Sequence, residues 1–411
     1  MSDRLLPLWL RRAPSVDARG FALLSGVEAT VRGILITVLP LSVYRAFPDT
    51  GTVSKIYFVI GLLSLLAGLM VPQVTRVVPR RYTYSIGVGL FVLGNTFAII
   101  GGRYIIFALF CHAIATVTCF VCLNAYVLDY VSKVELGRTE TLRIFYSALA
   151  WAVGPVAGVW LLSFWRPAPF IVSMIAAIIL LAVFWYLRLG DGKLIARARQ
   201  QAPNPLAYLG RFFAQPRLIG GWLFAVLRHC GWWTYVVYLP IFALQMGLGD
   251  KIGGTMQSTT NMLLFATPLL LRWIQRRTVR FALRTGFLFG GLCLIAATLA
   301  AHWLPLTLIL LFLASICLVL LDMTAGLPFL LAVKPSERSE MSAIYSSFRD
   351  VSGIVSPGVT WAVLQVAPLA AVFSAVGLAF LFAWSLAGRL HPQLGIMAAE
   401  RARMRRVQIP Q

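Results

Sequence analysis

Long apolar runs separated by short polar stretches dominate the pattern of this chain. The runs last about 20 residues or more, the length that an α-helix needs to cross a hydrocarbon core. They do not alternate with a period of two, so they are typical of membrane helices rather than of a β-barrel. The pattern predicts an all-α membrane protein with twelve transmembrane segments, at residues 20–46, 53–75, 82–101, 104–130, 141–163, 168–188, 218–245, 252–274, 281–301, 304–332, 341–366 and 368–389.

The polar connections between these segments are short, with one exception. Residues 189–217 separate six predicted segments from six others. We therefore expect an N-terminal six-helix half at 20–188, a cytoplasmic central loop at 189–217 and a C-terminal six-helix half at 218–389. Tails at 1–19 and 390–411 flank the two halves, and the second tail is strongly basic.

Composition agrees with the membrane interpretation. Hydrophobic residues make up 59% of the 411 and charged residues only 12%, whereas soluble domains carry about 25% charged residues. The six cysteines all lie inside apolar segments, without the spacing of a metal site, so we interpret them as packing residues. We expect no removable signal peptide, no cofactor, no metal and no enzymatic activity.

The net charge of +22 would suggest a nucleic-acid partner in a soluble protein. Here 28 of the 36 lysines and arginines, Arg143 and Arg284 among them, fall in the tails, in alternate loops or at the adjoining segment ends on one side, and only five fall on the other side. This is the positive-inside pattern, and it predicts cytoplasmic termini in a bacterial inner membrane. It explains the charge without nucleic acid. We expect the tail arginines to contact anionic lipids at the cytoplasmic face: Arg401, Arg403, Arg405 and Arg406.

The two predicted halves share short sequence matches. Residues 138–140 (Arg-Thr-Glu) correspond to residues 338–340 (Arg-Ser-Glu) at an offset of 200. Residues 39–40 and 239–240 are both Leu-Pro at the same offset. Matches in the same order indicate parallel repeats, related by an axis along the membrane normal.

Twelve segments in two parallel halves, joined by a basic loop, resemble the major facilitator superfamily. Residues 72–81 keep the trailing basic pair of the family's loop between its second and third helices, but Pro72 and Arg76 replace its Gly and Asp. In the fifth segment, Gly154, Pro155 and Gly158 match the G-P-x-x-G motif of the family's proton-driven exporters. The glycines would allow a close helix contact, and the proline a kink. The resemblance implies a transporter whose segments 1, 4, 7 and 10 line a central cavity.

The first segment carries Glu28 and Arg32 one helical turn apart. A charge at bilayer depth costs several kcal/mol unless it meets a partner, water or protein interior, so such residues are usually functional. Burial favours the neutral form of a carboxyl, and a neighbouring cation favours the charged form. We therefore expect Glu28 to carry a coupling proton and Arg32 to bind substrate. The alternative is a pair that only neutralises itself.

The seventh segment carries Arg228, the repeat partner of Glu28 at the offset of 200. Arg228, Trp232 and Tyr235 share one helix face, where a cation beside aromatic rings suits an aromatic or anionic substrate. Helix packing is the alternative for these aromatic residues. The remaining polar residues that we expect to bind substrate are His229, His112 and Asn124.

Other intramembrane charges are expected to hold helices together or to form gates. Asp129, at the cytoplasmic end of the fourth segment, is expected to pair with Arg143 or Arg138. We expect Asp322 to pair with Arg349. Asp350 neighbours Arg349 on a helix and needs a separate partner, because adjacent residues point about 100° apart.

These features predict a secondary transporter that works by alternating access, as a monomer, on a small-molecule substrate. The first hypothesis is proton-coupled export, by antiport, of an amphipathic or drug-like compound. The second is an organic-anion or phosphate-ester transporter that uses Arg32 and Arg228. The third is a sensor or scaffold with a transporter-like fold that moves no substrate.

Overall fold

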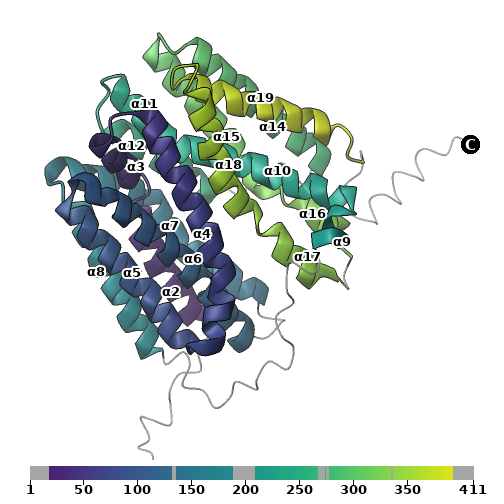
Figure 1. Ribbon diagram of the computed structural model, residues 1–411. Helices are drawn as coiled ribbons and strands as arrows, with labels where there is room; N and C mark the ends of the chain where they lie inside the picture. The colour runs from purple at the N-terminus through teal and green to yellow at the C-terminus, as the bar shows by residue number, and fades with distance from the viewer. Residues whose placement is uncertain are drawn as a thin grey trace, which may run out of the picture. The chain divides into compact units, whose positions relative to one another are not determined.

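The computed structural model describes residues 18–131, 136–187, 209–266, 274, 277–334 and 337–391 (Figure 1). Every regular element within these ranges is a helix, which confirms the all-α prediction. The lipid contact predicted for the C-terminal tail falls outside the described residues, because it rests on Arg401, Arg403, Arg405 and Arg406.

Contacts between residues divide the chain into two compact units, Met1–Ile36 with Leu63–Arg199, and Thr37–Leu62 with Gln200–Gln411. Helix α4 (Thr50–Val77) contributes to both. The other helices of the first unit are α2 (Ala18–Gly33), α5 (Arg80–Ile100), η2 (Gly102–Tyr104), α6 (Ile105–Tyr130), α7 (Leu136–Phe164) and α8 (Ala168–Tyr186). The other helices of the second unit are α3 (Val38–Ala46), α9 (Leu209–Phe213), α10 (Pro216–Trp233), η4 (Thr234–Tyr238), α11 (Leu239–Gln245), α12 (Lys251–Met262), η5 (Leu263–Ala266), α14 (Val279–Leu299), α15 (Leu304–Thr324), α16 (Leu327–Ala332), α17 (Arg338–Tyr345), α18 (Phe348–Val363) and α19 (Ala371–Ala387).

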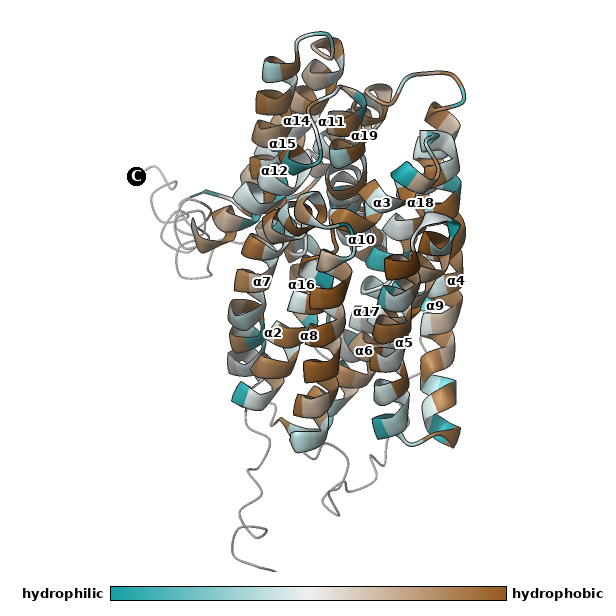
Figure 2. Ribbon diagram, turned by 90° about the vertical axis from the view of Figure 1, so that its left-hand side faces the viewer, coloured by the Kyte–Doolittle hydropathy of each residue, from teal (hydrophilic) through white to brown (hydrophobic). Residues whose placement is uncertain are grey.

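Eight helical stretches within the described ranges are long and apolar enough to cross a membrane. They are Arg19–Ala46, Thr50–Val77, Arg80–Ile100, Gly102–Val127, Thr139–Phe164, Ala168–Tyr186, Val279–Leu299 and Leu304–Ala332. Figure 2 shows that hydrophobic residues dominate most of these helices. The chain is therefore a helical membrane protein, and the full set of twelve crossings stays a prediction.

Several predicted segments are interrupted rather than continuous, and the first and the seventh are interrupted at equivalent positions of the repeat. Segment 20–46 consists of α2 and α3 with a turn at residues 34–37 between them, and segment 218–245 contains the π-helical turn η4. Pro40 and Pro240 lie just after these interruptions. Proline lacks the N–H of a helical hydrogen bond, and its ring displaces the preceding turn. The two interruptions begin 200 residues apart, at the offset of the sequence repeat.

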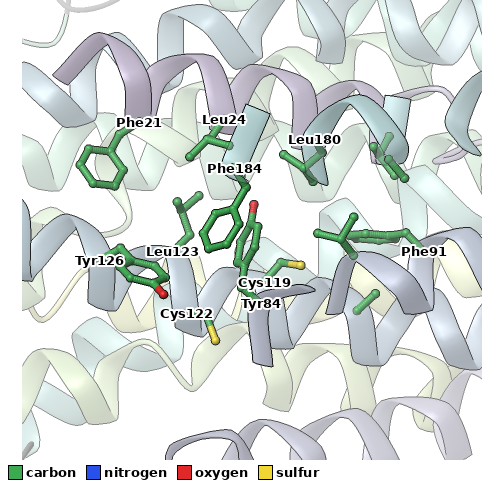
Figure 3. Close-up of a cluster of buried hydrophobic side chains, with 14 of the residues drawn as sticks. Phe21, Leu24, Tyr84, Phe91, Cys119, Cys122, Leu123, Tyr126, Leu180 and Phe184 are labelled. Carbon is green, nitrogen blue, oxygen red and sulfur yellow. The ribbon is translucent and has the colours of Figure 1, made fainter. Parts of the chain in front are cut away.

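Aromatic and aliphatic side chains of α2, α5, α6 and α8 fill the core of the first unit (Figure 3). The rings of Tyr84 and Phe184 stack at its centre, with 4.3 Å between their centroids. Cys119 and Cys122 are buried in this core, and both are free thiols. The contacts agree with the interpretation of these cysteines as packing residues.

Helices α2 and α7 approach so closely that their backbones touch. A Cβ atom on Gly154 would lie 2.6 Å from the carbonyl carbon of Gly33, and one on Gly33 would lie 2.7 Å from the carbonyl oxygen of Ala150. Pro155 lies inside α7, and Gly158 is buried on it. Only residues without a side chain permit this separation, so the glycines set the position of α2 against α7.

We predict that Gly154→Ala lowers the free energy of unfolding by about 1–3 kcal/mol, because the added methyl group forces two helix backbones apart. Thermal unfolding of the purified protein in detergent measures the change. Gly89→Ala is the matched control, because nothing lies within 4 Å of a Cβ at that helical glycine. Equal unfolding midpoints for the two variants would contradict the close contact.

Asp49 caps the N-terminus of α4. Its carboxylate accepts the backbone N–H groups of Gly51 at 3.2 Å and Thr52 at 2.7 Å, and the Thr52 hydroxyl at 2.6 Å. The Thr52 hydroxyl, followed by its backbone N–H, holds the pKa of Asp49 below its usual range. The charged carboxylate therefore stabilises the start of this helix.

We predict that Asp49→Ala lowers the free energy of unfolding by about 1 kcal/mol, whereas Asp49→Asn, which retains a capping oxygen, has a smaller effect. The charged carboxylate adds its full contribution to the free energy of unfolding above the pKa that Asp49 has in the unfolded chain. This contribution is lost as pH falls through the lower pKa of Asp49 in the folded state. Unfolding midpoints measured from neutral to acidic pH should show the wild type approaching the alanine variant. A gap that does not narrow with acidification would refute the charged cap.

Candidate functional site

The first unit carries a charged pair on α2. A guanidinium nitrogen (Nη1) of Arg32 lies 3.5 Å from Oε1 of Glu28, and the two residues are one turn apart on one helix face. The Glu28 side chain is only 8% exposed, whereas that of Arg32 is 34% exposed. The Arg32 guanidinium also lies over the ring of Trp151 on α7, 5.4 Å from its centre. The acid is thus buried behind a cation that other groups can reach.

A second cation, Arg143 of α7, penetrates the same unit. Its Nε donates to Ser25 Oγ at 2.8 Å, and its Nη1 donates to Asn124 Oδ1 at 3.2 Å and to Glu140 Oε1 at 2.6 Å. Its side chain is only 12% exposed, and its charge acts electrostatically on Glu28. These contacts join α2, α6 and α7 around one guanidinium.

The sequence pattern gave Arg143 the wrong role, as a basic loop residue and a partner of Asp129. Two signals pointed to its burial. Arg143 lies inside the predicted segment 141–163, and Glu140 precedes it by three residues, a spacing that places both on one helix face. Asn124, predicted to bind substrate, accepts a hydrogen bond from this arginine in the described structure.

His112 belongs to a polar chain that crosses four helices. Its Nε2 lies 3.3 Å from Asn95 Oδ1 on α5, Asn95 donates to Ser173 on α8 at 3.2 Å, and Ser173 donates to the carbonyl oxygen of Val31 on α2 at 2.9 Å. The His112 ring also packs against Phe91. These partners support a structural role, the alternative to substrate binding for this residue.

The second unit carries its own charged pair, between α10 and α15. Arg228 Nη1 lies 2.9 Å from Asp322 Oδ1, and Trp232 Nε1 donates to the other carboxylate oxygen at 3.0 Å. The Arg228 side chain is 13% exposed and that of Asp322 is 32% exposed. The spacing of four residues lets Arg228 and Trp232 reach one carboxylate from one helix face. This arrangement corrects the expected pairing of Asp322 with Arg349.

The ring of Phe348, at the start of α18, contacts three basic side chains of this region. The guanidinium carbons of Arg228 and Arg349 lie 5.2 and 5.6 Å from the centre of its ring, and His229 makes an edge contact with it. The Nε of Arg228 is buried without a hydrogen-bond partner among the described residues. Asp350 is half-buried on α18, and no ion pair involves it within the described ranges. Arg228 and His229 are thus brought together, with Phe348 as an aromatic contact that the sequence pattern missed.

Tyr235 bonds to neither Arg228 nor Asp322 within the described ranges, and its hydroxyl meets other partners. It is 3% exposed, and its hydroxyl lies 2.8 Å from the hydroxyl of Thr260, which in turn bonds to Ser315 at 2.8 Å. These contacts bury Tyr235 between η4, α12 and α15 and favour packing over substrate binding. The ring of Tyr235 also makes an edge contact with Trp232, with 6.2 Å between the ring centroids, as the predicted shared face requires.

Contacts around α3 and the first half of α4 form another polar cluster of the second unit. Arg45 pairs with Asp250, and Gln245 donates to Tyr44 at 3.1 Å. Further along α4, the hydroxyl of Ser54 lies 3.0 Å from that of Tyr238. Partners about 200 residues apart carry no local sequence signal, so this cluster was not predicted.

A sequence profile of the Major Facilitator Superfamily matches residues 21–357. The chain belongs to this superfamily. A solved structure of a mutant of the nucleoside transporter NupG is similar, with a TM-score of 0.68, 12% identity, and coverage of 90% of this chain and 98% of that one. A solved structure of a bacterial homologue of the iron transporter ferroportin, in an inward-facing state, is also similar. Its TM-score is 0.66 at 15% identity, with coverage of 93% of this chain and 100% of that one. At these identities the likeness concerns the fold. A comparison with curated protein sequences finds no match.

Membership in the superfamily makes the divergent loop motif at residues 72–81 informative. Arg80, the first of its trailing basic pair, pairs with Asp129 at the end of α6 and lies 5.3 Å from the centre of the Tyr126 ring. Asp129 therefore meets Arg80, not the expected Arg143. The ion pair joins the start of α5 to the end of α6, which is compatible with a gating role for Asp129.

We predict that Asp322→Asn lowers the free energy of unfolding by about 2 kcal/mol, because it leaves the mostly buried Arg228 without its carboxylate. Partial exposure of the pair to solvent keeps this loss below that of a fully buried pair. The double variant Arg228→Gln/Asp322→Asn should recover part of this loss, since no isolated charge remains. Thermal unfolding in detergent measures all variants, with Asp350→Asn as a control acid. Strict additivity of the two single changes would contradict a coupled pair.

Proposed function

We propose that this superfamily member is a proton-coupled secondary transporter that exports an amphipathic or drug-like small molecule by alternating access. The observation that carries the proposal is the Glu28–Arg32 pair, in which a nearly buried acid lies 3.5 Å from a partly exposed cation. The superfamily's fold supplies the transporter class, and the pair supplies the coupling chemistry.

The coupling step follows from the cost of an isolated buried charge. While Glu28 is charged, Arg32 compensates it, and removal of either partner leaves a charge that is expensive to keep out of water. Protonation of Glu28 neutralises the acid and frees Arg32 to bind another group. A substrate that binds Arg32 and stacks on Trp151 would then compete with the charged form of Glu28. Proton and substrate are exchanged through one shared guanidinium.

The charge balance supports this hypothesis over the anion transporter. Arg32 faces Glu28, and Arg228 faces Asp322. An anion-binding clamp needs cations whose charge is available, whereas both of these arginines already have a carboxylate partner. The pair of Arg228 and Asp322, with Trp232 and Phe348 beside it, is better suited to a neutral or cationic compound with an aromatic group.

The remaining parts of the proposal concern orientation and gating. The positive-inside pattern supports cytoplasmic termini in a bacterial inner membrane, with halves at 20–188 and 218–389. In that orientation Arg45 and Asp250 lie at the outer side, and their ion pair would help to close it. The ion pair of Arg80 and Asp129 would stabilise the cytoplasmic side of the first unit.

The substrate has first to be found. A thermal-shift screen of the purified protein at two pH values should include amphipathic cations, neutral amphiphiles, nucleosides, divalent metal ions and phosphate esters. We expect the largest stabilisation from a neutral amphiphile with a hydrogen-bond acceptor, because the Arg32 guanidinium that binds it in this mechanism repels a cation. The nucleosides and metal ions are included because one structurally similar protein is a nucleoside transporter and the other is a homologue of an iron transporter.

We predict that Glu28→Gln abolishes transport of the screened compound driven by a pH gradient in reconstituted vesicles, while folding is retained. Glutamine keeps the shape of the side chain but cannot exchange a proton. Asp49→Asn is the matched control, because it neutralises an acid outside the predicted segments and should keep the wild-type rate.

Undiminished gradient-driven flux in Glu28→Gln would refute the proton-carrier role. A phosphate ester as the strongest ligand, transported without a pH gradient, would favour the organic-anion hypothesis. Absence of any flux in the wild type, with every ligand that the screen returns, would favour a non-transporting sensor or scaffold.

A further inference from the structure

A groove of about 300 Å³ lies on the second unit between α14 and α19. Its lining residues come from one face of α14 and from the end of α19, and they are Phe281, Arg284, Thr285, Leu288, Phe289 and Trp384. Helices α14 and α19 pack along each other, as Figure 1 shows. Five of these six residues repeat along α14 at the spacing of a single helix face.

The groove opens toward the hydrocarbon rather than into the unit. Helix α14 is one of the stretches that can cross a membrane. Phe281 is 45% exposed and Phe289 is 55% exposed, so the rims of the groove are apolar side chains that lipid tails would cover. An arginine in such a place requires an explanation, because charged side chains facing lipid are costly.

Arg284 is the charged member of the lining. Its guanidinium lies over the Trp384 ring, 4.8 Å from the centre, and its Nε is buried without a hydrogen-bond partner among the residues that the structure describes. No carboxylate within the described part of the chain forms an ion pair with it. The hydroxyl of Thr285 already bonds to the Phe281 carbonyl at 2.9 Å. The groove therefore combines apolar walls with a cation that has no carboxylate partner and an unsatisfied Nε among the described residues.

The position of Arg284 along α14 matches the depth of lipid headgroups. It is the sixth residue of the helix, roughly 8 Å from the helix start at 1.5 Å per residue. An arginine near a helix end extends its guanidinium toward the interface, and a guanidinium binds phosphate oxygens through two parallel hydrogen bonds. Arg280 lies one turn nearer the helix start, and Arg277 contacts the Phe281 ring. The mouth of the groove is thus positively charged.

We propose that this groove binds one anionic phospholipid. Its phosphate bonds to the guanidinium of Arg284, and one acyl chain lies along Phe281, Leu288 and Phe289. The lipid supplies the anion that the described residues lack, and it fastens α14 to α19 through Trp384. With the orientation inferred from the basic residues, the lipid belongs to the inner leaflet. The site is independent of the transport hypothesis, because none of its residues belongs to the charged pairs described above.

Native mass spectrometry of the full-length protein in detergent tests the proposal, with phosphatidylglycerol and phosphatidylcholine added in equal amounts. Wild-type protein should retain one phosphatidylglycerol with a preference of roughly fivefold, the effect of one basic residue at an anionic headgroup. Arg284→Gln should reduce the preference to near unity. Arg103→Gln removes the same charge from an exposed position of the first unit, whose residues do not line the groove, and it should keep the preference.

Leu288→Trp provides a second test that leaves Arg284 intact. The larger side chain fills the groove and should displace the bound phosphatidylglycerol, and this variant decides the question if Arg284→Gln unfolds. The proposal is overturned if wild type shows no preference, or if Leu288→Trp and a folded Arg284→Gln retain it in full. A wild-type dimer that Leu288→Trp dissociates would also overturn it, since the groove would then hold a second copy of the chain.

Discussion

The cost of keeping a charge away from water governs this protein more than any other interaction. A carboxylate or guanidinium in a low-dielectric interior loses several kcal/mol of hydration and recovers it only through a well-placed partner. The chain meets this constraint three times within its described helices. Glu28 faces Arg32, Asp322 faces Arg228, and Arg143 gathers Ser25, Asn124 and Glu140. The helices that carry these residues must remain where the partners meet.

The close packing of α2 and α7 serves that requirement. Gly33 and Gly154 bring the two backbones into contact, and the same contact lets Trp151 of α7 lie beside Arg32 and lets Arg143 reach Ser25. In the second unit, α10 supplies both Arg228 and Trp232 to one carboxylate. Each unit therefore presents a charged pair with a tryptophan, built from different residues at related positions of the repeat.

The class of fold could be predicted from the sequence because each membrane helix is recognisable from its own continuous run of apolar residues. Apolar length predicted the helical membrane fold, whereas the Leu-Pro pairs at 39–40 and 239–240 indicated only a repeat, although they lie just after helix interruptions. The i,i+4 spacing likewise predicted the contact of Glu28 with Arg32. Each of these signals lies within a single segment of the chain.

Contacts between distant helices could not be read in this way. The partner of Asp322 was expected on α18, yet α10 supplies it, since the choice depends on helix rotation and not on spacing. Arg143 appeared to be a loop cation until its neighbours on α2 and α6 were visible. Tyr235 contacts Trp232 as its spacing predicted, but its hydroxyl bonds to Thr260 on α12, a partner that the sequence did not indicate. Arg284 was counted among the basic residues that set topology, and only the groove beside Trp384 distinguishes it.

Whether Glu28 exchanges a proton inside the membrane decides between coupling and a static ion pair. Infrared difference spectroscopy of the purified protein, titrated over the pH range in which it stays folded, observes protonated carboxyl groups directly. We expect a carboxyl band that grows as pH falls, that is absent from Glu28→Gln and that persists in Asp322→Asn. A titration in which wild type and Glu28→Gln give the same carboxyl bands at every pH would contradict a proton carried by Glu28.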